Sequence, residues 1–130
     1  MNWLTKRQIA NAVAVGSIAS IYCSMIHWQQ ILEAGPKEYC EASDVSIGCD
    51  NCALCQRQLA SGKTLKCPLN GKCCERGVGG IHVMNCCEEY YTAREAIYLE
   101  LKHPMYQWHP KTQIIITKLI ERIRDVLPKM

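Results

Sequence analysis

The sequence predicts a mostly α-helical single domain, residues 1–130, in which about three helices flank an irregular, cysteine-rich insert. Apolar residues recur with helical spacing near the N-terminus and again over the last third of the chain. The region between them, residues 36–85, is rich in glycine and contains seven of the ten cysteines. A segment of this length without periodicity needs another organising force, and coordination of a metal ion supplies one.

The first helix is expected over residues 5–34. Thr5 can cap its start and Gly35-Pro36 ends it, while Gly16 either bends it or divides it in two. Its apolar and polar side chains separate by face, so we expect the apolar face to contact the core. The apolar face consists of Val15, Ile18, Tyr22, Met25 and Leu32. The polar stripe consists of Ser17, Ser20, Ser24 and His27.

An uncharged run over residues 9–26 also raises the alternatives of a signal peptide and a short membrane span. The run is only weakly apolar, and its helical pattern continues to Leu32, beyond the point where a cleaved signal would end. An amphipathic helix in a cytoplasmic protein without a membrane partner is therefore expected. In a reducing compartment thiols serve as ligands more often than they form disulfides.

Two further helices are expected over residues 86–103 and 110–127. Asn85 and Glu88 resemble a capping box before the first of them, which ends at His103-Pro104. Pro110 suits the first turn of the second. The face of the first consists of Tyr90, Arg94, Ile97 and Leu101, and that of the second of Ile115, Leu119, Ile123 and Val126.

Six cysteines form what we call the cysteine cluster: Cys49, Cys52, Cys55, Cys67, Cys73 and Cys74. Two-residue gaps such as that between Cys52 and Cys55 let neighbouring thiolates turn back onto one ion. The pattern predicts a tetrahedral zinc ion held by Cys52, Cys55, Cys67 and one of Cys73 or Cys74. Asn70-Gly71 can form the turn that the return of the chain requires.

An iron–sulfur cluster is the main alternative cofactor, because Cys49, Cys52 and Cys55 have the spacing of bacterial ferredoxins. Cys67-Pro68 lies twelve positions beyond Cys55, however, where ferredoxins place a Cys-Pro after three residues. Disulfides are favoured only if the N-terminus is a signal. Cys40, His82 and Cys86-Cys87 could hold a second ion, although buried packing is the preferred interpretation of the doublet, and Cys23 is expected in the core.

The segment between His103-Pro104 and His109-Pro110 predicts a loop with exposed aromatic residues. We assign Tyr106, Trp108 and His109 as candidate partner-binding residues, because such side chains are frequent at interface hot spots. Trp28 is expected to pack the insert onto the first helix, and His27 beside it is not expected to be catalytic. No arrangement of nucleophile and base can be assigned, so we do not expect an enzyme.

Several motifs together resemble a family of small phage- and prophage-encoded proteins of unassigned function. They are His27-Trp28, Cys52-Ala53-Leu54-Cys55, Cys67-Pro68-Leu69, Cys73 or Cys74, and Tyr90-Tyr91. The family commonly has a cysteine three residues before the Cys-Pro, and this sequence has Thr64 there. The resemblance covers about half of the chain and implies a phage protein that acts in a bacterial cytoplasm.

These observations predict a small zinc-binding protein that acts as a protein-binding module, with a host or phage protein as its partner. Its specific form would be an inhibitor of a bacterial defence or metabolic protein. One alternative is a zinc-stabilised nucleic-acid-binding protein, although a net charge of +3 gives little electrostatic footprint. The residues for that alternative are Lys111, Lys118, Arg122 and Arg124. The other alternative is an iron–sulfur or redox protein.

Overall fold

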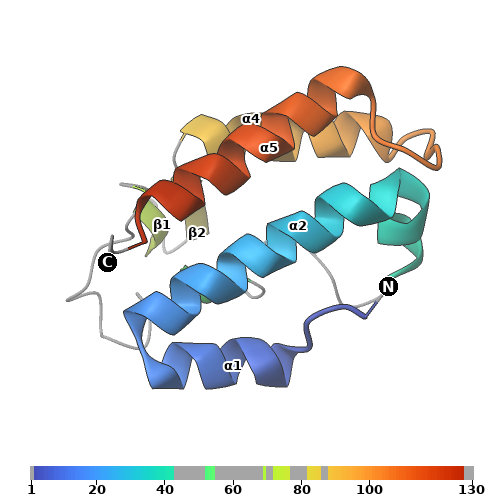
Figure 1. The fold of residues 1–130 in the computed structure, drawn as a ribbon. Helices are drawn as coiled ribbons and strands as arrows, with labels where there is room; N and C mark the ends of the chain where they lie inside the picture. Colours follow the sequence, from blue (N-terminus) through green and yellow to red (C-terminus); the bar gives the residue numbers. More distant parts are fainter. Residues whose placement is uncertain are drawn as a thin grey trace.

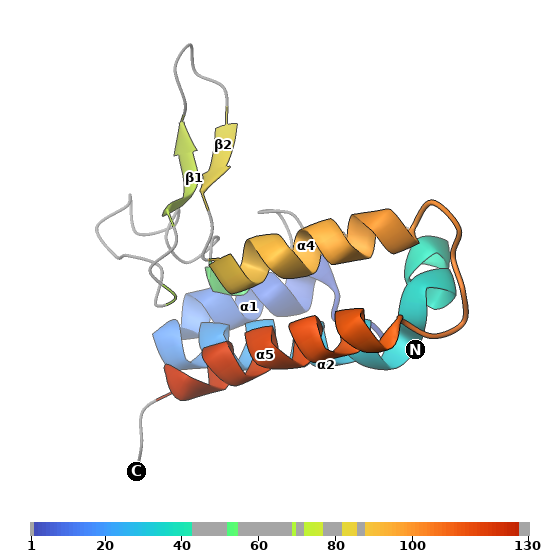
Figure 2. The same cartoon turned by 90° about the horizontal axis from the view of Figure 1, so that it is seen from above.

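The computed structural model describes residues 2–42, 52–54, 69, 72–76, 82–85 and 88–127. These residues are mostly helical, as predicted, and they also contain one pair of strands. The long helices pack in the order α1, α2, α5, α4, with α2 lying between α1 and α5 and running antiparallel to both (Figures 1 and 2). The helices are α1 (Lys6–Val15), α2 (Ser17–Glu41), α4 (Glu88–Glu100) and α5 (Pro110–Asp125), and the strands are β1 (Lys72–Arg76) and β2 (His82–Asn85).

Gly16 divides the expected first helix into α1 and α2. Thr5 caps α1 as predicted, because its Oγ1 accepts a hydrogen bond from the Gln8 amide at 3.1 Å and Gln8 returns one to the Thr5 amide at 2.8 Å. At Gly16 the backbone has φ 147° and ψ −169°, a conformation that only glycine adopts without strain. The chain reverses there, so α1 folds back along α2.

The predicted helix end at Ala34 is borne out, since Gly35 is not helical, but a second helical segment that was not predicted follows directly. Gly35 introduces a kink at φ 80° and ψ 172°, but helical backbone resumes at Pro36 and continues to Glu41. Proline lacks an N–H and has a fixed φ, which suits the first turn of a helix as well as it terminates the preceding one. Gly35-Pro36 therefore joins two helical segments, and residues 36–41 belong to α2 and not to an irregular insert.

The orientation predicted for the first helix is wrong at three of its five apolar positions, whereas Met25 and Leu32 pack against the core. Val15, Ile18 and Tyr22 are 79%, 52% and 49% exposed, whereas Ser20 and Ser24 are buried. His27, expected on the polar stripe, is buried as well. The buried side of α2 obtains its apolar area from Ile21, Cys23, Trp28 and Ile31, which alternate with the serines.

Small serine side chains permit close packing against this buried side. Ser20 Oγ donates a hydrogen bond to the Gly16 carbonyl at 2.8 Å, so its burial leaves the hydroxyl satisfied.

One hydrophobic core joins α2, α4 and α5. Trp28 of α2 meets Tyr90 of α4 edge to face, with ring centroids 5.5 Å apart. The predicted inner faces of the C-terminal helices are confirmed where Tyr90, Ile97, Leu119 and Ile123 are buried. Leu54 and Leu69 of the insert belong to the same core as Trp28, in keeping with its predicted anchoring role.

The expected capping box at Asn85 is wrong, because Asn85 is the last residue of β2 and α4 begins only at Glu88. The insert is not wholly irregular either. β1 and β2 pair antiparallel, with Arg76 opposite His82 and Lys72 opposite Asn85, and the register shifts between Lys72 and Glu75. Alternation in these short segments is too weak a signal to separate a strand pair from a loop.

Candidate functional site

The motif Cys52-Ala53-Leu54 is held against the helices at the start of the cysteine cluster. Ala53 and Leu54 are 1% and 3% exposed, and Cys52 is half-buried. Leu54 joins the main core, while Ala53 joins a smaller core formed by α1 and α2 with Ile9, Val13 and Cys23. The residues between and beside the predicted thiolate ligands thus position Cys52 next to the helical scaffold.

Cys23 is buried in α2, as predicted for a core residue. Burial raises the pKa of the Cys23 thiol, and the neighbouring Cys52 thiolate raises it further by charge repulsion. This interaction requires that the two sulfurs lie near one another. Cys23, which was predicted as a core residue, therefore also lies beside Cys52, a predicted zinc ligand.

The remaining predicted ligands are described only in part. Cys49, Cys55 and Cys67 lie outside the described residues, as do Cys86 and Cys87. Cys73 and Cys74 belong to β1, and His82 begins β2. Within the described portion of the chain, no three His, Cys, Asp or Glu side chains gather in a way that could hold a metal ion. Zinc ligation accordingly stays a prediction.

A second anchor of the insert lies just after Cys67-Pro68. Leu69 is 5% exposed in the main core, and its carbonyl accepts a hydrogen bond of 3.5 Å from Arg122 Nη2 on α5. Arg122, one of the candidates for nucleic-acid binding, is half-buried, and its guanidinium donates to this backbone group. Lys111, Lys118 and Arg124 are exposed.

The loop between α4 and α5, residues 103–109, is fastened to the kink of α2. The Lys37 amide donates to the Met105 carbonyl at 2.9 Å, and Lys37 Nζ donates to the Tyr106 hydroxyl at 3.1 Å. The same ammonium lies 4.5 Å from the centroid of the Tyr106 ring, a cation–π arrangement. At the other end of the loop, the His109 amide donates to Glu100 Oε1 at 2.8 Å.

Of the three predicted partner-binding residues, Trp108 is not on the surface. It is 2% exposed, and its indole Nε1 donates to the Ile31 carbonyl of α2 at 2.7 Å. The prediction of an exposed Trp108 is wrong because the ring packs into the main core and its N–H finds a backbone acceptor on α2. Tyr106 is 76% exposed, as predicted, and the adjacent Met105 is 66% exposed. His109 is exposed, but its Nδ1 caps α5 by accepting from the Lys111 amide.

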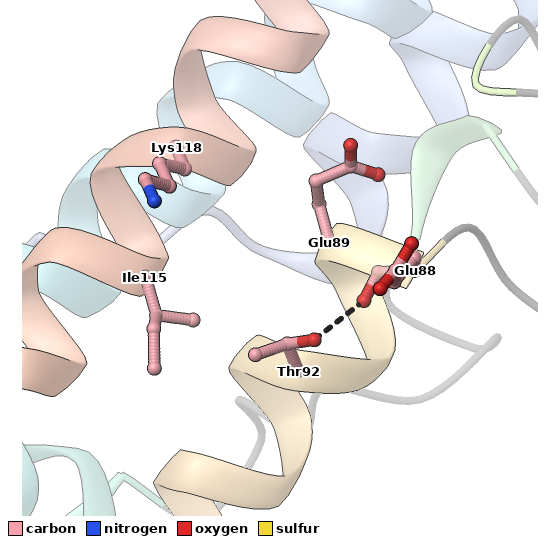
Figure 3. A pocket seen from close by; sticks show the side chains of 5 residues that line it. All are labelled: Glu88, Glu89, Thr92, Ile115 and Lys118. Atoms are coloured by element: carbon pink, nitrogen blue, oxygen red, sulfur yellow. Dashed lines mark hydrogen bonds between the residues drawn. The ribbon is translucent and has the colours of Figure 1, made fainter.

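A pocket of about 330 Å³ opens between the first turns of α4 and the middle of α5 (Figure 3). Glu88 and Glu89 lie on one wall, and Lys118 and Ile115 lie on the other. The two carboxylates extend in different directions, so they do not form an acid–base pair (Figure 3). The Thr92 hydroxyl donates to the Glu88 carbonyl at 2.9 Å and serves the helix. We assign no chemistry to this pocket.

No family model, no curated protein and no solved structure matches this chain. None of the helices described in the structure has both the length and the apolar character needed to cross a membrane.

Proposed function

We propose that this chain is a zinc-binding, phage-type protein of the bacterial cytoplasm that acts as a protein-binding module. Its partner would be a host protein, and inhibition of a defence or metabolic protein is the specific form of the proposal. The observation that carries it is the fixed loop between α4 and α5, which presents Met105 and Tyr106 at 66% and 76% exposure.

A fixed, exposed aromatic residue is suited to binding because little conformational entropy remains to be lost. Tyr106 is held at its hydroxyl and beneath its ring by Lys37, while the loop backbone is held through Met105. Tyrosine combines a large contact area with a polar end, and methionine adapts to irregular surfaces.

Zinc would be held by Cys52, Cys55, Cys67 and one of Cys73 or Cys74, with Cys49 as a further candidate. Two buried anchors support this part of the proposal, because Cys52–Leu54 and Leu69 give the cysteine cluster a base on the helical core. A structural zinc ion contributes on the order of 10–16 kcal/mol to folding. That amount would order the insert that the anchors leave between them.

Elemental analysis of protein purified without added metal tests the zinc site. We expect one equivalent of zinc, which Cys52→Ser removes and Cys40→Ser retains. Cys40 is the matched control because it is an exposed thiol at the end of α2, outside the cluster. Iron with visible absorbance would select the iron–sulfur alternative. Protein without metal, whose thermal melting ignores a strong chelator, would contradict the zinc proposal.

Affinity capture from host lysate tests the partner. We expect a stoichiometric host protein that Tyr106→Ala fails to capture and Val15→Ser still captures. Val15 is a suitable control because it is similarly exposed, at 79%, and ends α1 two residues before α2 begins, whereas the kink is at Gly35 near the other end of α2. Recovery of nucleic acid alone, with binding that falls steeply with salt, would favour the nucleic-acid alternative. Equal capture by both variants would show that the loop does not bind the partner.

A further inference from the structure

The outer side of α2 carries a row of exposed apolar residues, which we call the α2 stripe: Ile18, Tyr22 and Ile26. They are 52%, 49% and 40% exposed. Residues four apart on a helix form one continuous ridge, so these three side chains lie one above another. Val15, 79% exposed at the end of α1, continues the apolar surface toward Gly16. This is the face that periodicity alone assigns to the core.

With Val15, the side chains of the α2 stripe expose on the order of 400 Å², within the range of the largest apolar patch on an ordinary monomer, which is often functional. In Figure 1, α1 and α5 flank α2 on either side, so the remaining side of α2 faces outward. The exposed fractions of Ile18, Tyr22 and Ile26 show that α1, α4 and α5 leave this ridge largely uncovered.

Along α2 itself the stripe has no charged neighbour. From Gln8 to Leu32 the sequence has no Lys, Arg, Asp or Glu. A helix that lies on a membrane carries Lys and Arg on its own polar face to reach anionic lipids, and α2 has none over these residues. The exposed sides of α4 and α5 differ, since Glu95, Lys118 and Glu121 are exposed on them.

The stripe is symmetric about its centre, because an isoleucine lies four residues before Tyr22 and another lies four residues after it. In a twofold interface the same patch faces itself, and residue i meets residue j while j meets i. Two antiparallel copies of α2 with the axis at Tyr22 would pair Ile18 with Ile26 in both directions. The two Tyr22 rings would then meet at the axis, where offset stacking of aromatic rings is favourable.

We propose that this protein forms a twofold dimer through the α2 stripe. The ridge is an i±4 row, so the two helices would cross at about −50° with axes 8–10 Å apart. Together with Val15 the stripe offers about 400 Å² per chain, half of the roughly 800 Å² that each partner contributes to a standard interface. The dimer is therefore weak, and we expect it to form only at high protein concentration. It leaves the loop at residues 103–109 outside the interface.

Sedimentation of the full chain, from about 1 µM to about 1 mM, tests the dimer. We expect reversible association that Tyr22→Glu weakens at least about tenfold, because two like charges would face each other at the axis. Leu99→Glu is the control, since Leu99 is 64% exposed on α4 and is not part of the α2 stripe, and we expect less than about a twofold change. Circular dichroism of both variants verifies that the helices are retained.

A photo-crosslinking residue at position 22 provides a second measurement. We expect it to join position 22 of one chain to α2 of another in the same concentration range. A monomer at every concentration would overturn the proposal, as would equal weakening by the two glutamate variants. If the protein stays monomeric and co-sediments with anionic phospholipid vesicles, the α2 stripe binds a membrane surface. That result would also overturn the dimer proposal.

Discussion

Replacement of Gly35 by alanine tests whether the kink of α2 fixes the loop at residues 103–109. Gly35 has φ 80° and ψ 172°, a region that costs other residues about 1–3 kcal/mol. A Cβ at this position would also overlap the carbonyl oxygen of Tyr106 and lie 3.0 Å from its carbonyl carbon and 3.3 Å from Gln107 Cα. Because these are backbone atoms, the loop has to move.

Gly16→Ala separates the two contributions. Gly16 also has a positive φ, 147°, but a Cβ there would meet nothing within 4 Å. The gain from restricting the unfolded chain is the same for both substitutions and cancels in their difference. Forced overpacking costs about 1–3 kcal/mol, so we expect Gly35→Ala to lower the free energy of unfolding by that much more than Gly16→Ala.

Urea unfolding followed by helical circular dichroism measures this difference. With a slope of about 1–3 kcal/mol per molar urea, the Gly35→Ala midpoint should lie about 1 M below that of Gly16→Ala. The Lys37 amide reports on the loop, because it donates to the Met105 carbonyl and should lose protection from hydrogen exchange only in Gly35→Ala. Equal midpoints, or unchanged protection at Lys37, would refute the argument that Gly35 permits the close approach of the loop.

Further substitutions and labelling test the core and the thiols. Trp108→Phe should lower the free energy of unfolding by about 1–3 kcal/mol in urea titrations, since a buried carbonyl loses its donor, and an unchanged midpoint would contradict that hydrogen bond. Ser20→Ile should lower the free energy of unfolding by about 1–3 kcal/mol through overpacking, whereas Ile18→Ser should change it by less than about 0.5 kcal/mol in dilute solution. The reverse order would show that Ile18, and not Ser20, faces the core. Iodoacetamide should label exposed Cys40 much faster than Cys23, whose burial and raised pKa limit access and thiolate formation, and mass spectrometry showing equal rates would place Cys23 at the surface.

Helix ends were predictable where a local signal exists. Thr5 caps α1, and Pro110 occupies the first turn of α5, as expected. The pair Asn85 and Glu88 has the same form as a capping box but fails, because Asn85 pairs with Lys72 in the strand ladder. A capping motif describes what a residue can do locally, and a partner strand distant in sequence can use the same residue differently.

The candidate site was predictable only in its chemistry. The cysteine spacing suggested a metal ligand at Cys52, but not that Cys52 lies beside Cys23 of α2. The exposure of Tyr106 followed from its place in a short loop between two prolines. That Lys37 holds this tyrosine depends on the return of the loop to the kink of α2, a contact between residues far apart in the chain. No pattern in the loop itself indicates that contact.

The amino-acid sequence alone determined the helical class, the helix end before Gly35 and the inner faces of α4 and α5, because glycine, proline and a single apolar stripe act through local backbone geometry. It marked Gly16 as a bend or a break, and the structure decided for a break. Tertiary structure decided which side of α2 is buried. This helix has two sides that could form a core, one with Ile18 and Tyr22 and one with Ile21, Trp28 and Ile31. Only the second side has small serines that let α1 approach closely. Its large residues also join the core with α4 and α5, so packing against the neighbouring helices determines which side is buried.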